Sequence, residues 1–113
     1  MRRFGKYRAV KSQCSSGHTH DSKKEAAYCN ALHIRLEAGE ISDLQTSVQF
    51  WFVIDGKALK HRNGRRVGYL ADFSFIENGH YVVVEVKGFS VRDWPLRRAI
   101  FCALYPNIDF REV

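Results

Sequence analysis

The stretch from Tyr69 to Gly88 most strongly constrains the fold, because it has the pattern of two strands joined by a tight turn. Asn78 and Gly79 occupy the two central turn positions, where the backbone needs φ > 0, and asparagine and glycine tolerate that conformation. A two-residue turn at this point sets the pairing along the hairpin: Phe75 with Val82, Phe73 with Val84, and Asp72 with Glu85. We therefore predict two paired strands that bring two carboxylates face to face.

Asp72 and Glu85 are the strongest candidates for a chemical site. Like charges directly opposite each other in a sheet cost roughly 0.2–1 kcal/mol, and a bound cation would relieve this repulsion. Hard cations such as Mg²⁺ bind carboxylate and carbonyl oxygens, so the carbonyl of Val86 is a third candidate ligand. Strand alternation places Leu70 and Lys87 on the same face. Lys87 could then orient or help deprotonate water and stabilise charge on a phosphoryl group. The alternative is a pair of surface acids neutralised by Lys87 and an arginine on an open sheet face.

Glu25 is a further candidate, at the start of a helix predicted from residue 21 to about residue 38 and ended by Gly39. Helical spacing places Glu25 on the apolar face of that helix. The same face carries three more residues: Cys29, Leu32 and Leu36. Ser22 and Glu25 also fit a capping box, in which the glutamate binds the backbone at the helix start. Capping and catalysis are both open roles for this carboxylate.

The remaining pattern predicts one α/β domain, ordered helix, three strands, helix, strand, with the acidic hairpin in the centre. The other predicted segments are a connection at 41–44, a strand at 48–54, a turn at Asp55-Gly56 with a short continuation at 57–59, a helix at 94–105 and a strand at 108–113. The predicted apolar stripe of the second helix consists of Leu96, Ile100, Ala103 and Leu104.

The charge of the chain indicates a polyanionic partner, because 18 Lys and Arg residues against 12 Asp and Glu residues leave a net charge of +6. We predict nucleic-acid contacts in a basic N-terminal arm at residues 1–11, in a loop at residues 60–66 and at the start of the second helix. The predicted contact residues are Arg2, Arg3, Lys6, Arg8, Lys60, Arg62, Arg65, Arg66, Arg97 and Arg98. A solvated terminus and a solvated loop are the alternatives.

Two further observations concern location. No apolar run approaches the ~20 residues that a membrane-spanning helix needs. Three cysteines form an odd number without framework spacing, which predicts free thiols in a reducing cytoplasm.

Asp72 is followed, on the next predicted strand, by Glu85-Val86-Lys87. This arrangement resembles the D…(D/E)-x-K signature of the PD-(D/E)XK nuclease superfamily, although Ala71 stands where the signature has proline. The resemblance extends to small phage- and prophage-encoded nucleases that are similar to Holliday-junction resolvases. It is carried by KYR at 6–8, DSKKEA at 21–26, AGEISDL at 38–44, YLADF at 69–73, EVKG at 85–88 and ALYP at 103–106.

The resemblance implies a restriction-endonuclease-like αβββαβ core, with a mixed central sheet flanked by two helices. It also implies DNA cleavage that depends on Mg²⁺ or Mn²⁺, with Asp72 and Glu85 as ligands, Lys87 as catalytic lysine and Glu25 as the helix acid. Gln49, on the preceding strand, is an additional site candidate. Symmetrical cutting of branched DNA would need a homodimer. The alternatives are a nuclease without junction preference and an inactive DNA-binding module of the same fold.

Overall fold

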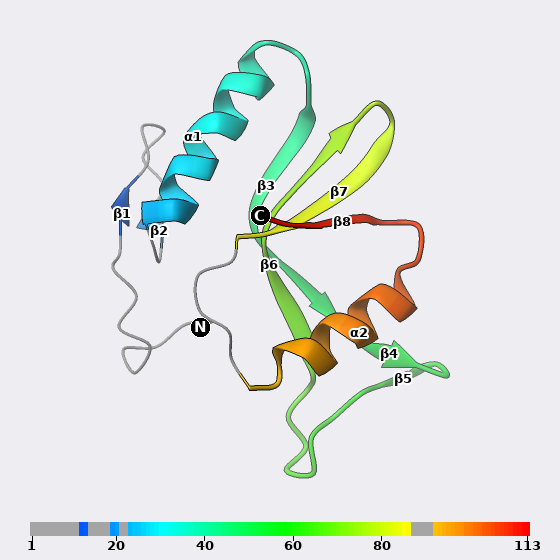
Figure 1. The fold of residues 1–113 in the computed structure, drawn as a ribbon. Coiled ribbons are helices and arrows are strands. Elements are labelled where there is room, and N and C mark those ends of the chain that lie inside the picture. The colour runs from blue at the N-terminus through cyan, green and yellow to red at the C-terminus, as the bar shows by residue number, and fades with distance from the viewer. Residues whose placement is uncertain (1–11, 14–18, 21–22, 87–91) are drawn as a thin grey trace.

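A mixed four-stranded sheet with one helix on each face forms the centre of the computed structural model, which describes residues 12–13, 19–20, 23–86 and 92–113 (Figure 1). The strand order is β3-β6-β7-β8; β8 is parallel to β7, and the other neighbours are antiparallel. The elements are β1 (Ser12–Gln13), β2 (Thr19–His20), α1 (Lys23–Glu37), β3 (Ser42–Trp51), β4 (Val53–Ile54), β5 (Lys57–Ala58), β6 (Gly68–Glu77), β7 (His80–Glu85), α2 (Trp94–Leu104) and β8 (Asp109–Glu112). Neither described helix is long and apolar enough to cross a membrane.

The hairpin formed by β6 and β7 has the predicted register. Asn78 and Gly79 have φ values of 52° and 77°, as a two-residue turn of this kind requires. The observed partners include Phe73 with Val84 and Phe75 with Val82. The two strands lie in the middle of the sheet, so the prediction of a central acidic hairpin is confirmed.

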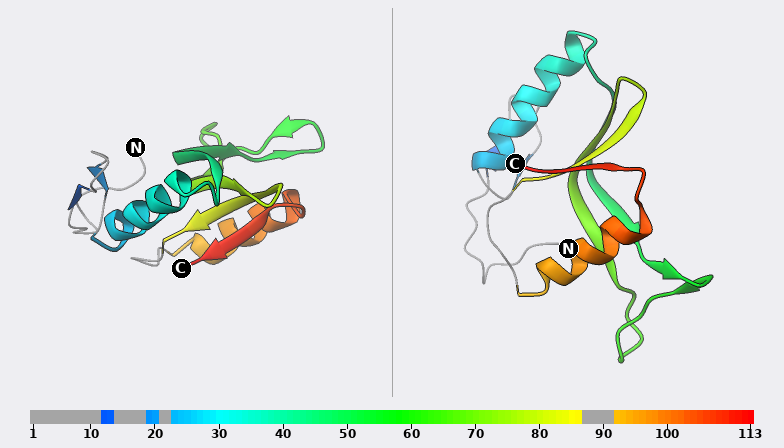
Figure 2. Two further views of the ribbon diagram at one scale, coloured as in Figure 1. Left: turned by 90° about the horizontal axis from the view of Figure 1, so that it is seen from above. Right: turned by 45° about the vertical axis from the view of Figure 1, so that its right-hand side comes forward.

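Two hydrophobic clusters lie on opposite faces of β7. Val82 and Val84 pack with Cys29 of α1, whereas Val83 packs with Phe101 of α2. Figure 2 shows the two helices on either side of the sheet. Burial of both strand faces explains why this strand is an almost continuous run of valine.

Helix α1 ends as the sequence predicts, at Gly39, which has a φ of 77°. The Gly39 N–H donates to the carbonyl of Leu36 at 3.1 Å, and the Glu40 N–H donates to the carbonyl of Arg35 at 2.9 Å. These two bonds form a Schellman motif, which satisfies the last carbonyls of the helix. At the other end of the helix, Ser22, the predicted capping residue, lies outside the described residues.

Strand β3 begins earlier than the sequence predicts. The segment at residues 41–44 was expected to be a connection, but the strand starts at Ser42. Asp43 and Ser47 both have φ values of 53°, in the left-handed region. Because such residues interrupt the alternation of side chains, the apolar pattern did not indicate a continuous strand.

Helix α2 buries only part of the predicted stripe. Ile100 and Leu104 pack against the cluster that contains Phe101, as predicted. Leu96 is 66% exposed and Ala103 is exposed, whereas Phe101, outside the predicted stripe, is 1% exposed. The Phe101 ring packs against Phe50, Tyr69, Tyr105 and Phe110. The large aromatic ring fills the space above the sheet, so the buried face of the helix is centred on Phe101 and leaves Leu96 and Ala103 outside it.

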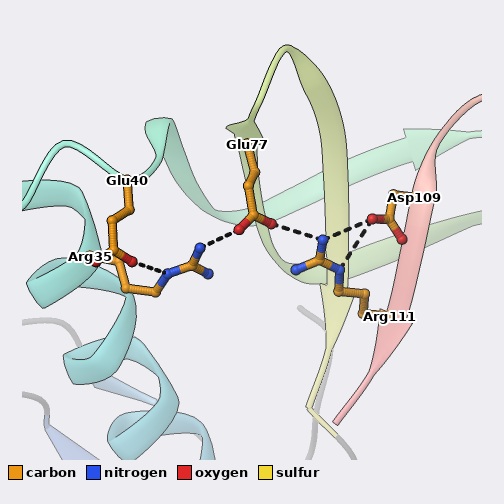
Figure 3. Close-up of polar contacts among 5 residues, drawn as sticks. All are labelled: Arg35, Glu40, Glu77, Asp109 and Arg111. Atoms are coloured by element: carbon orange, nitrogen blue, oxygen red, sulfur yellow. Dashed lines mark hydrogen bonds and ion pairs between the residues drawn. The ribbon is translucent and has the colours of Figure 1, made fainter.

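A chain of ion pairs joins α1, β6 and β8 near the turn of the central hairpin (Figure 3). Arg35 binds Glu40 at 3.0 Å and also binds Glu77. Arg111 binds the other oxygen of Glu77 and the carboxylate of Asp109, each at 2.8 Å. Glu77 therefore links the helix to the last strand of the sheet.

We predict that Glu77→Gln lowers the melting temperature near neutral pH and loses this effect in acid. Hydrogen bonds from Arg35 and then Arg111 hold the pKa of Glu77 below its usual value of 4.5. A carboxyl with a lowered pKa stabilises the fold above the pKa of the unfolded chain, and this stabilisation is lost as the pH falls through the folded-state pKa. Thermal unfolding of both proteins between about pH 7 and pH 3 measures the difference.

Glu37→Gln, at an exposed position of α1, is the matched control and should lack this pH-dependent gap. A gap between wild type and Glu77→Gln that stays constant over the whole range would contradict the assignment.

Candidate functional site

Asp72 is buried in the central hairpin, with a relative exposure of 1%. Its Oδ2 atom accepts a hydrogen bond of 2.8 Å from the backbone N–H of Val86. The regular ladder between β6 and β7 reaches the pair Phe73–Val84, and one further step of that register places Asp72 across from Glu85. The hydrogen bond brings Asp72 to the backbone of Val86, the residue next to Glu85, and the direct pairing of Asp72 with Glu85 stays a prediction.

The side-chain alternation of β6 breaks at Asp72. Ala71 packs in the cluster under α2, whereas Phe73 packs in the cluster under α1, although a regular strand would place them on one face. On the neighbouring strand β3, Thr46 pairs with Phe73 and Val48 pairs with Ala71. Ser47, between them, has a φ of 53°. Irregularities of this kind are common beside active sites, where they re-aim a side chain. The expectation that Leu70 shares the face of Asp72 assumes regular alternation through this break, and it stays a prediction.

Tyr69 fixes the position of Glu85. Its hydroxyl donates to Glu85 Oε1 at 2.7 Å. The tyrosine is 4% exposed, and its ring centroid lies 5.0 Å from that of Phe101 and 5.2 Å from that of Trp94. A carboxylate held by a packed aromatic side chain loses little freedom when it binds a ligand. Sequence reasoning missed this contact.

Glu112 is a second residue that sequence reasoning missed. It lies beside Glu85 in the parallel ladder between β7 and β8. Its carboxylate accepts hydrogen bonds from Trp94 Nε1 at 3.1 Å and from Arg98 Nε at 2.6 Å. The arginine compensates the charge of Glu112. Strands β7 and β8 are parallel and are joined through α2, so no tight turn sets their register. The sequence therefore gave no signal that Glu112 lies beside Glu85.

Glu25 lies on the packed face of α1, as predicted, and is 4% exposed. Ala26, the next residue, packs in the same hydrophobic cluster as Val86. The helix therefore rests on the sheet face to which Val86 contributes. Lys87, the predicted catalytic lysine, lies outside the described residues.

The described acids fit a partial set of metal ligands. Within the described ranges, no group of three or more His, Cys, Asp or Glu side chains is arranged to hold a metal ion. Asp72 and Glu85 supply two carboxylates, and Val86 adds a carbonyl oxygen. Mg²⁺ commonly binds through one or two carboxylates, with water and substrate phosphate completing its shell. The donor set thus suits a hard divalent ion that is shared with a phosphate substrate.

The predicted basic residues fall into three groups. Lys60, Arg62, Arg65 and Arg66 are exposed in the loop before β6. Arg97 donates to the carbonyl of Gly68 and to Asp93, and Arg98 binds Glu112, so these two arginines stabilise the fold. Four predicted contacts lie outside the described residues: Arg2, Arg3, Lys6 and Arg8.

Gln49, the additional candidate, is exposed on β3 across from Leu70. Its amide nitrogen donates to the carbonyls of Phe50 at 3.2 Å and Tyr69 at 3.3 Å. Gln49 therefore contacts the backbone of β6 three residues before Asp72.

The chain belongs to the family described as "Protein of unknown function (DUF1064)", whose model matches residues 4–113. No curated protein and no solved structure matches the chain.

We predict that Asp72→Ala destabilises the protein more than Asp72→Asn. Alanine leaves the buried N–H of Val86 without its carboxylate acceptor, which costs about 1–3 kcal/mol of unfolding free energy. Asparagine keeps an acceptor oxygen at the same position and removes the buried charge. Urea denaturation of the two variants measures the difference, and equal stability would show that this hydrogen bond does not hold the hairpin end together.

Proposed function

We propose that this protein is a metal-dependent DNA endonuclease that hydrolyses phosphodiester bonds. The observation that carries the proposal is the hydrogen bond of 2.8 Å from the Val86 N–H to Asp72, which places this acid at the end of the strand that carries Glu85. Asp72 is 1% exposed and stands where the side-chain alternation of β6 breaks. Two acids confined in this way repel each other unless a cation or a proton offsets the charge.

Mg²⁺ or Mn²⁺ is the proposed cofactor, held by Asp72, Glu85 and the carbonyl of Val86. When bound, such an ion supplies Lewis-acid stabilisation of the charge that develops on phosphate oxygens. Tyr69 keeps Glu85 in place for that task through its hydrogen bond of 2.7 Å. Lys87, two residues beyond Glu85, is proposed to stabilise negative charge on the phosphoryl group and to orient the attacking water.

Glu25 is proposed as the acid that positions the attacking water from the helix side. Its burial on the packed face of α1 favours this role, because a carboxylate used only for capping has no need to face the sheet. If Glu25 only caps the helix, Asp72, Glu85 and Lys87 would carry out the cleavage without it.

The proposed fold family is the restriction-endonuclease-like one. The larger elements follow the order α1, β3, β6, β7, α2, β8, which is the αβββαβ order expected from the sequence resemblance. The mixed sheet and the two flanking helices are compatible with this assignment.

DNA is the proposed substrate, in particular branched DNA such as a four-way junction cut by a homodimer. The net charge of +6 and the exposed cations at 60–66 support a polyanionic partner. The arm at residues 1–11 and Gln49 are proposed as further contacts. We place this activity in phage recombination or replication, in the cytoplasm of a bacterial host.

The second candidate is a DNA-binding module that keeps the fold without cleavage. It is favoured by the absence, among the described residues, of a complete group of three metal-binding side chains. Such a module would bind DNA equally well in the presence and absence of divalent ions.

We predict Mg²⁺-dependent cutting of a four-way junction, beside matched linear duplex and single strand, that is lost in EDTA. Asp72→Asn and Glu85→Gln remove metal ligands, and Lys87→Ala removes a charge that stabilises the transition state. Each should lower the single-turnover rate by about a hundredfold or more. Glu37→Gln, an exposed acid on α1, is the matched control and should cut like wild type. Inactive wild type on all three substrates, or full activity of Lys87→Ala, would refute the proposal.

A further inference from the structure

Trp51 is an exposed aromatic residue at the end of β3, beside the basic loop. It pairs with Gly68, the first residue of β6, and is 42% exposed. A Cβ atom at Gly68 would lie 2.8 Å from Trp51 Cε3, so only glycine lets the ring lie this close to β6. The guanidinium of Arg66 lies 4.7 Å from the ring centroid. The indole and the guanidinium therefore form an ordered pair at the surface.

The loop at residues 60–66 is ordered by its own hydrogen bonds. Lys60 and Arg66 form a β-bridge, the His61 N–H donates to the carbonyl of Arg65 at 2.7 Å, and the Gly64 N–H donates back to the carbonyl of His61 at 2.9 Å. Figure 1 shows this loop and the β4–β5 hairpin extending past α2, away from α1. A preformed loop pays little conformational entropy on binding.

The cations of this loop are not neutralised by the fold. Within the described part of the chain, Lys60, Arg62 and Arg65 form no ion pair. By contrast, Arg35 and Arg111 both bind Glu77. Unpaired, exposed cations on a fixed loop are suited to a polyanion.

We propose that the Trp51–Arg66 pair and this loop bind a single-stranded segment of DNA. An unpaired base stacks on the indole or guanidinium plane while its phosphates contact Lys60, Arg62 and Arg65. A base inside a duplex already stacks on its neighbours, so a duplex gains only the phosphate contacts. The aromatic plane therefore gives a preference for unpaired bases over duplex DNA.

The position of the pair refines the substrate class, and this step rests on the proposed nuclease function. Gly68 precedes Asp72 by four residues on β6, which is about 13 Å along a strand. One DNA strand can therefore contact both Trp51, which pairs with Gly68, and Asp72. The protein would then cut near a junction between duplex and single strand, with the unpaired side lying on Trp51.

The test is binding in EDTA, where cleavage plays no part. Wild type is titrated with a thymidine oligonucleotide and with a blunt duplex of the same length, at one salt concentration, and tryptophan emission is followed. Trp94 packs against Tyr69 and Phe110 and is less exposed than Trp51, so we expect the single strand to quench mainly Trp51. Trp51→Phe should remove this quenching, and the duplex should produce little of it.

Two substitutions at the same position separate stacking from packing. Trp51→Leu keeps an apolar cover over Gly68 but has no aromatic plane, and should weaken single-strand binding about five- to hundredfold. Trp51→Phe should retain most of the affinity, and neither change should alter duplex binding. Ile34→Ala, an exposed apolar position on α1, is the control.

Equal affinity of Trp51→Leu and wild type for the single strand, or an equal loss for duplex and single strand, would overturn this inference. Either result would leave the cleavage test of Asp72 untouched. Conversely, loss of single-strand binding in Trp51→Leu would support the stacking site even if wild type cut no DNA.

Discussion

The register of the β6–β7 hairpin is the constraint on which the rest of the structure depends. The turn at Asn78-Gly79 decides which residues of the two central strands are neighbours. A slip of one residue would reverse the faces of the valines on β7 and expose apolar side chains on both sides. The same slip would move Asp72 away from the N–H of Val86. Core packing under both helices and the position of Asp72 therefore depend on the same register, so the two hydrophobic clusters also hold this acid in place.

The break in alternation at Asp72 is where the fold departs from a regular sheet. It allows Ala71 to pack under α2 while Phe73 packs under α1, so one strand contributes to both clusters. It also leaves the carboxylate of Asp72 to bind the N–H of Val86 where the regular ladder has ended. Burying a carboxyl group costs free energy unless it is hydrogen-bonded, and the N–H of Val86 supplies one such bond.

Local signals in the sequence predicted much of the fold. The turns at Asn78-Gly79 and Asp55-Gly56 and the helix end at Gly39 follow from residues that adopt positive φ, and all three are confirmed. The predicted start of β3 was wrong, and the predicted apolar face of α2 was right only for Ile100 and Leu104. Both features depend on tertiary packing, around irregular backbone in β3 and around the ring of Phe101 in α2. At the candidate site, the turn predicts which residues of β6 and β7 are neighbours. It does not specify the hydrogen bond from Tyr69 to Glu85 or the pairing of Glu112 with Glu85 in the parallel ladder.

Paramagnetic broadening of amide resonances by Mn²⁺ tests directly whether Asp72 and Glu85 bind a divalent ion. The protein offers an internal comparison, because Glu77 and Asp109 form a second acidic pair that is already neutralised by Arg111. If Asp72 and Glu85 share a divalent ion, substoichiometric Mn²⁺ will broaden the amides of residues 71–73 and 84–86 first, and Asp72→Asn will abolish this effect. Broadening centred on Glu77 and Asp109, or broadening that persists in Asp72→Asn, would contradict the account.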